Sequence, residues 1–191
     1  MGRTIIVTFT SLDGVVDDPD GTYCTPHGGW ALRAGPAAMG GDKFHLGEIF
    51  PESVVLLGRV TWDLFSQRWP GREGEFAEQM NAVDKHVMTT HDIDVSAWSN
   101  SSVVTGTLED EIVALTVDRN AVVIGSLSIA RRLLTAGLVD EIRFLVFPVV
   151  VGSGDRLIVP DNGPLDLELQ SVEHLPPTTM LTYSVARRPV D

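Results

Sequence analysis

The chain has 191 residues, of which 43% are hydrophobic, and this is enough to build one well-packed core, so we expect a single domain over residues 1–191. The 26 acidic and 14 basic residues give a formal net charge of −12, which argues against a nucleic acid or an anionic membrane surface as a partner. The one cysteine, Cys24, excludes an internal disulfide and favours a reducing compartment, most naturally the cytoplasm.

The first predicted element is a strand over residues 3–10, whose run of Ile5, Ile6 and Val7 is typical of a strand buried on both faces of a sheet. This strand begins too early for a signal peptide, and no apolar run approaches the roughly 18 residues of a membrane span. We therefore expect a protein that is neither exported nor membrane-spanning. Residues 12–30 then lose periodicity and fill with Asp, Gly and Pro, which indicates a functional segment that we call the long loop.

The middle of the chain alternates predicted strands and helices, which is typical of an α/β fold. A weak helical pattern covers residues 37–50, and residues 70–83 favour a solvated loop with a short helix. The remaining predictions are strands over 53–57, 85–89, 102–105 and 121–124, and helices over 61–69, 108–116 and from 127 to the stop at Gly137.

Two of these strands run through a glycine straight into a helical pattern. Gly58 follows the apolar run 54–57, and Gly125 with Ser126 follows the apolar run ending at Ile124. A strand that turns directly into a helix presents backbone N–H groups to an anion. Two such turns predict a dinucleotide held at both of its phosphate regions.

After Asp140 the pattern changes to consecutive strands, over residues 141–151, 165–174 and 179–187. Turns are expected at 152–154, as a hairpin turn, and at Pro176-Pro177. The sheet should therefore finish antiparallel, as a mixed, mainly parallel sheet of about eight strands.

Several short motifs follow one another along the chain in a specific order and spacing. They are Thr10-Ser11-Leu12-Asp13-Gly14, Gly58-Arg59-Val60-Thr61-Trp62, Lys85-His86-Val87-Met88-Thr89-Thr90, Gly125-Ser126 with residues 133–141, and residues 147–154. In these motifs the chain resembles the dihydrofolate reductase-like superfamily, and most of all the branch with the reductase domain of riboflavin-biosynthesis deaminase-reductases and their stand-alone relatives. The resemblance implies a three-layer α/β/α fold that binds NADPH in a groove at the carboxyl ends of the strands. Together with the apolar run 144–151, it also implies a homodimer formed through the C-terminal strands.

The resemblance assigns residues to the adenosine and phosphate end of NADPH. In the turn that begins at Gly58, Arg59 is similar to the contact for the 2′-phosphate or adenosine phosphate, and Thr61 to the pyrophosphate contact. A guanidinium forms a fork that suits phosphate, and a threonine near a helix start adds a hydroxyl. Thr89 and Thr90 resemble hydroxyl-bearing residues near the adenosine ribose.

The resemblance also assigns a glycine turn and a nicotinamide wall. Gly125 and Ser126 are similar to the turn that passes close to the cofactor phosphates. Folate-reducing members have a second glycine where this chain has Ser126, so we do not expect their cis peptide bond here. Phe9 and Val16 align with the wall around the nicotinamide.

For the substrate side, we expect the long loop to cover the nicotinamide and one wall of the pocket, with Trp30 closing it. Asp13 is a candidate for substrate binding or catalysis, although an Asx turn explains it equally well. Asp42 and His45 are weak catalytic candidates without a clear family match. His45 and Glu48 alone do not make a metal site, so none is expected.

These observations predict an NADPH-dependent reductase that transfers a hydride to a small heterocyclic or carbonyl/imine substrate, pterin-like or riboflavin-precursor-like. The alternative is a non-catalytic nucleotide- or ligand-binding protein that keeps the cofactor groove. Turnover of NADPH with an acceptor separates the two.

Overall fold

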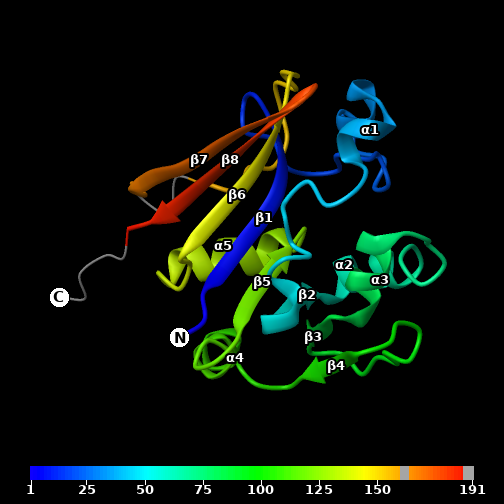
Figure 1. Ribbon diagram of the computed structural model, residues 1–191, viewed down its shortest axis with the longest axis vertical. Helices are drawn as coiled ribbons and strands as arrows, with labels where there is room; N and C mark the ends of the chain where they lie inside the picture. The colour runs from blue at the N-terminus through cyan, green and yellow to red at the C-terminus, as the bar shows by residue number, and fades with distance from the viewer. Residues whose placement is uncertain (160–163, 187–191) are drawn as a thin grey trace. The chain divides into compact units, whose positions relative to one another are not determined.

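The computed structural model describes residues 1–159 and 164–186 (Figure 1). Its eight described strands form one sheet in the hydrogen-bonded order β4-β3-β2-β5-β1-β6-β8-β7. The strands are β1 (Thr4–Ser11), β2 (Ser53–Gly58), β3 (Asp84–Met88), β4 (Ser101–Val104), β5 (Asn120–Ile124), β6 (Glu141–Phe147), β7 (Leu167–Leu175) and β8 (Thr178–Val185). The helices are α1 (Pro36–Met39), α2 (Arg59–Ser66), α3 (Glu75–Ala82), α4 (Leu108–Leu115) and α5 (Leu127–Thr135), with short 3-10 helices η1 (Ala31–Ala34) and η2 (Phe50–Glu52). The predicted mixed sheet of about eight strands is confirmed.

Contacts along the chain define two compact units, which are described separately. The first unit consists of Met1–Ile6 and His45–Val139, and the second of Val7–Phe44 and Asp140–Asp191. Residues of β1 therefore belong to both units. The sequence predicts one domain and does not predict this division.

The first unit holds the parallel part of the sheet, because β2 pairs in parallel with both β3 and β5, and β3 with β4. Residues 53–57 of β2 are all buried, and successive residues of a strand point to opposite faces, so both faces of β2 are covered. Helices α2 and α5 both contact β2, and α4 contacts both α5 and β5. This unit thus has the predicted α/β/α layers.

The second unit holds the antiparallel end of the sheet, in which β8 pairs with both β6 and β7. The turn between β7 and β8 contains the predicted Pro176-Pro177 pair, whose peptide bond is cis. An aromatic cluster connects parts of this unit: Phe147 of β6 contacts both Phe9 and Trp30, with ring centroids 5.3 and 5.5 Å apart.

Three predictions about local structure are wrong. Residues 37–50 do not form one helix: α1 ends at Met39, and the 3-10 helix η2 begins only at Phe50. The strand predicted over 141–151 ends at Phe147, where Pro148 lacks the N–H that the ladder needs. Residues 152–154 are not a hairpin turn, because β6 pairs with β8 and not with β7. Of the strand predicted over 179–187, Arg187 lies outside the described residues.

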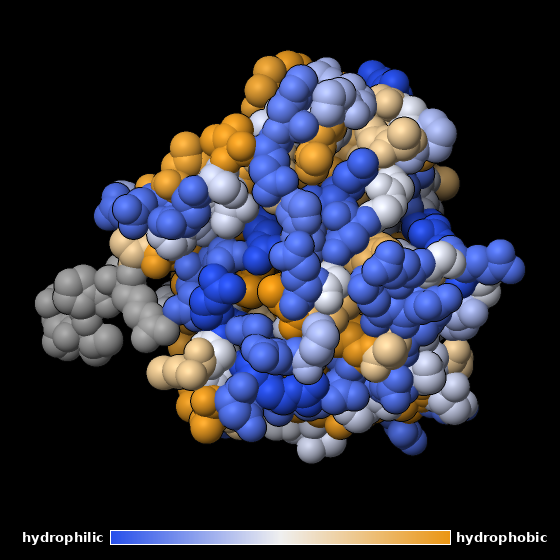
Figure 2. All heavy atoms as spheres, viewed as in Figure 1, coloured by the Kyte–Doolittle hydropathy of each residue, from blue (hydrophilic) through white to orange (hydrophobic). Residues whose placement is uncertain are grey.

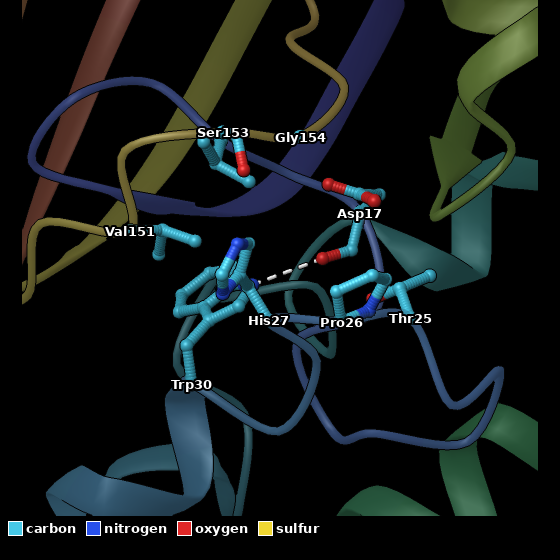
Figure 3. A pocket seen from close by; sticks show the side chains of 9 residues that line it. Asp17, Thr25, Pro26, His27, Trp30, Val151, Ser153 and Gly154 are labelled. Atoms are coloured by element: carbon cyan, nitrogen blue, oxygen red, sulfur yellow. Dashed lines mark hydrogen bonds between the residues drawn. The ribbon is translucent and has the colours of Figure 1, made fainter.

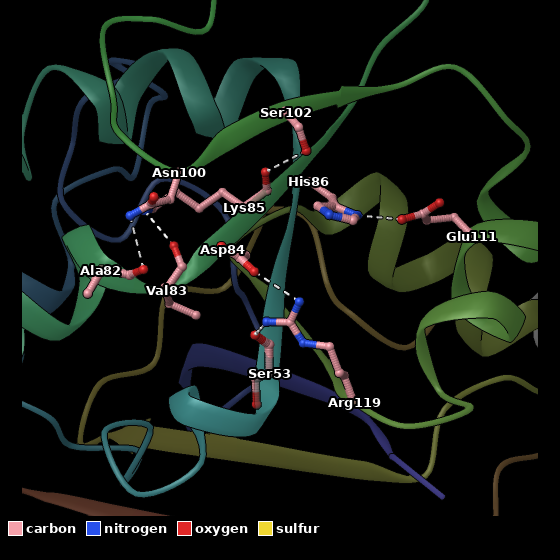
Figure 4. A network of polar contacts seen from close by, with 10 residues as sticks. All are labelled: Ser53, Ala82, Val83, Asp84, Lys85, His86, Asn100, Ser102, Glu111 and Arg119. Atoms are coloured by element: carbon pink, nitrogen blue, oxygen red, sulfur yellow. Dashed lines mark hydrogen bonds and ion pairs between the residues drawn. The ribbon is translucent and has the colours of Figure 1, made fainter.

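A fully buried lysine joins three segments of the first unit (Figure 4). The Lys85 ammonium donates hydrogen bonds to the backbone carbonyls of Asn81 (3.0 Å), Val83 (2.7 Å) and Ser99 (3.0 Å). It also lies 4.5 Å from the centre of the Trp98 ring. Loss of solvent around the ammonium lowers the pKa of Lys85 to about 8, although the negative charge of Asp84 acts in the other direction and raises it. Lys85 therefore ties the end of α3 to the segment that leads into β4.

We predict that the free energy of unfolding rises with pH between about 8 and 10.5, because over this range the unfolded chain binds a proton on Lys85 that the folded chain does not. Below pH 8 both states carry the proton, so this term is constant there. In Lys85→Met the rise should be absent, and in Lys43→Met, which removes the only other lysine, it should persist. Urea unfolding at a series of pH values measures it. Equal pH slopes for the wild type and Lys85→Met would contradict the prediction.

Candidate functional site

Two turns of the first unit lie against each other at the carboxyl edge of the parallel strands. The backbone N–H of Gly58, after β2, donates a hydrogen bond of 3.0 Å to the hydroxyl of Ser126, after β5. Gly125 has a φ of +66°, and a Cβ placed on it would lie 3.5 Å from the Thr61 methyl group. The two glycine turns that the sequence singles out therefore form one structure.

Both turns open a helix, α2 after Gly58 and α5 after Ser126. Gly58 has no side chain with which to cap α2, and the Ser126 hydroxyl bonds Gly58 instead of capping α5. The first-turn N–H groups of a helix have no partners inside the helix and carry a partial positive charge. Two adjacent helix starts of this kind suit a ligand with negatively charged phosphates.

Arg59 adds a cation at the same place. It is the first residue of α2, and its side chain is 41% exposed. Its guanidinium contacts the Asp63 carboxylate one turn further along the helix, at 2.7 Å. The side chain is thus at the surface, beside the helix start that the sequence assigns to a phosphate.

Thr89 and Thr90 follow the end of β3, which pairs in parallel with β2 so that Met88 lies opposite Gly58. The Thr89 hydroxyl accepts a hydrogen bond of 3.0 Å from the backbone N–H of His91, and Thr90 is exposed. The first unit therefore gathers seven predicted cofactor residues at one edge of its sheet. They are Gly58, Arg59, Thr61, Thr89, Thr90, Gly125 and Ser126.

The second unit contains the remaining predicted residues of the cofactor wall. Phe9 is partly exposed and stacks on Phe44, with ring centroids 5.7 Å apart. Val16 is held by a hydrogen bond from its backbone N–H to the carbonyl of Asp155. The wall residues are thus placed on β1 and at the start of the long loop.

The long loop folds back on residues 151–154 and encloses a cavity of about 120 Å³ (Figure 3). Its lining residues are Val15, Asp17, Thr25, Pro26, His27, Trp30, Val151, Ser153 and Gly154. The Trp30 indole N–H donates to the carbonyl of Asp17 at 2.9 Å, which fixes the ring against the loop. A cavity of this size has room for roughly one planar ring. The sequence predicts Trp30 in the wall of the pocket but neither His27 nor Ser153, whose only signal is their presence in glycine-rich segments.

Asp13 anchors the two sides of this cavity to each other. Its carboxylate accepts hydrogen bonds from the N–H groups of Val151 (3.0 Å) and Gly152 (2.8 Å) and from the Ser11 hydroxyl (2.7 Å). These hydrogen bonds hold the pKa of Asp13 well below its ordinary value, and the bond from Val151 has the largest effect. A carboxylate held ionised in this way does not readily donate a proton, so its contacts favour the structural interpretation over the catalytic one.

The other two catalytic candidates lie in different units. Asp42 is partly exposed in the second unit, and His45 belongs to the first. The His45 ring lies 4.0 Å from the Glu48 carboxylate. Among the described residues no group of three or more His, Cys, Asp or Glu side chains could hold a metal ion.

A family model for the RibD C-terminal domain matches residues 3–181. The chain belongs to this family. Across residues 1–159 and 164–186, the structure contains no helix with the length and apolar character needed to span a bilayer. Among curated proteins, no sequence matches the chain significantly.

Three solved structures with the same fold illustrate the likeness. One, from Shewanella sp. PV-4, is named for riboflavin biosynthesis and has 22% identity and a TM-score of 0.73, covering 97% of this chain and 99% of its own. A pyrimidine reductase-like protein from Corynebacterium diphtheriae has 14% identity and a TM-score of 0.61, covering 98% and 93%. Dihydrofolate reductase from Enterococcus faecalis, complexed with NADP(H) and RAB-propyl, has 13% identity and a TM-score of 0.57, covering 96% of both chains. These likenesses, all at 22% identity or less, establish the fold.

We predict that Ser126→Ala lowers the free energy of unfolding by about 1–3 kcal/mol, because it leaves the partly buried N–H of Gly58 without its partner. The matched control is Ser128→Ala, at an exposed position two residues further on, which should change stability by less than about 0.5 kcal/mol. Chemical denaturation measures both. If the two variants were equally stable, the hydrogen bond between the turns would not hold them together.

Proposed function

We propose that this RibD C-terminal domain protein is an NADPH-dependent reductase that transfers a hydride to a small heterocyclic or carbonyl/imine acceptor. The observation that carries the proposal is the pair of helix starts joined by the Gly58–Ser126 hydrogen bond, with Arg59 beside them. Bound NADPH would supply the hydride from its nicotinamide ring. The protein then has to bind the cofactor, orient it and exclude water.

The residues of the first unit fit the phosphate end of NADPH. Uncapped N–H groups at the starts of α2 and α5 suit the pyrophosphate, and the Thr61 hydroxyl adds a donor. The Arg59 guanidinium suits the 2′-phosphate, because its N–H fork matches phosphate oxygens. Thr89 and Thr90 offer hydroxyls for the adenosine ribose. With a formal net charge of −12, the chain needs such local positive groups to hold a polyanion.

The cavity of the second unit fits the acceptor. Trp30 provides a flat apolar wall, and His27, Asp17 and Ser153 provide polar groups around it. Figure 3 draws the side chains of both His27 and Trp30 in the lining of the cavity. An imidazole ring often serves as a general acid, so His27 would donate a proton to the acceptor as the hydride arrives. A single-ring acceptor, such as a pyrimidine-like riboflavin precursor, fits a cavity of this size better than the two fused rings of a pterin.

The proposal is tested by mixing the purified protein with NADPH and a panel of pterins, ribityl-pyrimidine precursors and quinones. Loss of absorbance at the reduced-nicotinamide band with at least one acceptor supports a reductase. Tight NADPH binding without oxidation by any acceptor would favour the non-catalytic alternative.

We predict that Arg59→Ala weakens NADPH binding by about 1.5–3 kcal/mol and leaves NADH binding nearly unchanged, since only NADPH carries the phosphate that Arg59 would contact. The control is Arg33→Ala, which removes the same charge from an exposed position in the second unit. Titration calorimetry with both nucleotides measures the difference. Equal affinity of the wild type for NADPH and NADH would remove the basis for this role.

We also propose that the protein is a homodimer formed through the C-terminal strands. One face of these strands is apolar because a register shift between Leu169 and Ser171 brings Val172 onto the same face as Leu169. Leu169 pairs with Tyr183 and Val172 with Leu181, and Phe144 contacts Tyr183 on the neighbouring strand. Leu169 and Val172 are 51% and 57% exposed. Hydrophobic spheres gather over β7 and β8 at the upper left of Figure 2, and a second copy of this face is their best cover.

We predict a dimer at micromolar concentration in sedimentation velocity and a monomer for Val172→Glu, because a buried unpaired carboxylate opposes the contact. Ser171→Glu serves as the control, since Ser171 pairs with Thr182 on the opposite face of the sheet. A wild-type monomer, or equal dissociation of both variants, would contradict this interface.

A further inference from the structure

The Arg59 guanidinium already has an anionic partner before any nucleotide binds. Its Nη1 lies 2.7 Å from Oδ2 of Asp63, and the two side chains are 41% and 39% exposed. The residues are four positions apart on α2, so they lie on the same side of the helix. Across the described ranges 1–159 and 164–186, Asp63 is the only partner that the structure gives to this guanidinium.

This ion pair differs from the exposed pair that Arg132 of α5 forms with Glu109 of α4. Arg132 donates from Nε and Nη2 to the two carboxylate oxygens of Glu109, at 2.7 and 2.5 Å, so this edge of its guanidinium is occupied by a two-pronged contact. Arg59 contacts Asp63 through one terminal nitrogen. A guanidinium has five N–H donors, so Arg59 keeps an open edge toward a second acceptor. An incoming phosphate would share Arg59 with Asp63.

We propose that Asp63 is a specificity-determining residue that weakens the preference of this site for 2′-phosphorylated nucleotides. The inference rests on the proposed function, in which Arg59 contacts the 2′-phosphate. A carboxylate 2.7 Å from the guanidinium cancels much of its positive field, and it repels a phosphate that carries roughly −1.5 to −2 charges.

An opposing effect is that Asp63 could hold Arg59 in a useful orientation. Exposed ion pairs four residues apart on a helix contribute little to order, so the orienting benefit is small. The repulsion between two anions around one cation is the larger effect. Competition between Asp63 and the phosphate for Arg59 should have a large effect on NADPH affinity in this chain, because its formal net charge of −12 supplies no general attraction for a polyanion.

The experiment compares binding of NADPH and NADH to the wild type and to Asp63→Asn. The substitution keeps the size of the side chain and removes its charge. We expect Asp63→Asn to bind NADPH about fivefold more tightly and to bind NADH within about twofold of the wild type. In the double variant Arg59→Ala with Asp63→Asn, the gain should vanish, because no guanidinium remains to be released.

The matched control is Asp118→Asn, which removes the same charge at an exposed position before β5, at the opposite end of the parallel strands from the turns. If Asp118→Asn strengthens NADPH binding as much as Asp63→Asn, the effect is general charge reduction and the inference is wrong. If Asp63→Asn weakens NADPH binding, Asp63 orients Arg59 and the inference is also wrong. Wild-type protein that binds neither nucleotide would instead refute the proposed function, and the inference with it. Thermal unfolding of each variant checks that the fold is kept.

Discussion

The hydrogen bond from the Gly58 N–H to the Ser126 hydroxyl is the contact on which the candidate site depends. Neighbouring parallel strands end at the same edge of a sheet, but this alone does not fix the turns that follow them. The hydrogen bond between Gly58 and Ser126 fixes the two turns, and it uses the Ser126 hydroxyl, which does not cap α5. As a result, two helix starts face the same edge with their N–H groups uncapped, and Arg59 stands beside them. The fold thus places a cation and two uncapped helix starts at one edge of the sheet in a strongly acidic chain.

In the second unit, backbone N–H groups bind a carboxylate that belongs to the protein itself. Asp13 takes the N–H groups of Val151 and Gly152 and so closes the long loop over residues 151–154. The cavity with Trp30 and His27 exists because of this closure. The first unit thus leaves backbone N–H groups uncapped at two helix starts, whereas in the second unit the N–H groups of Val151 and Gly152 are bonded to Asp13.

Much of this could be predicted from the sequence. The parallel strands were clear because they are apolar runs bounded by turn residues, and Gly58 and Gly125 marked the turns. The hydrogen bond between residues 58 and 126 could not be predicted, since it joins positions 68 residues apart. The helix expected over 37–50 failed because its weak pattern contains Gly40, Gly41 and Gly47, which do not favour a helix interior. The place of His27 in the cavity could not be predicted, because it depends on the long loop folding back on residues 151–154.

The central claim is that the joined turns of the first unit bind the phosphates of NADPH. It is tested most directly by following backbone amide resonances of the isotopically labelled protein by NMR as NADPH is added. The account predicts the largest shifts at the amides of Arg59, Val60, Thr61, Ser126 and Leu127, at the starts of α2 and α5. Saturable NADPH binding that leaves these amides unchanged and shifts others would contradict it.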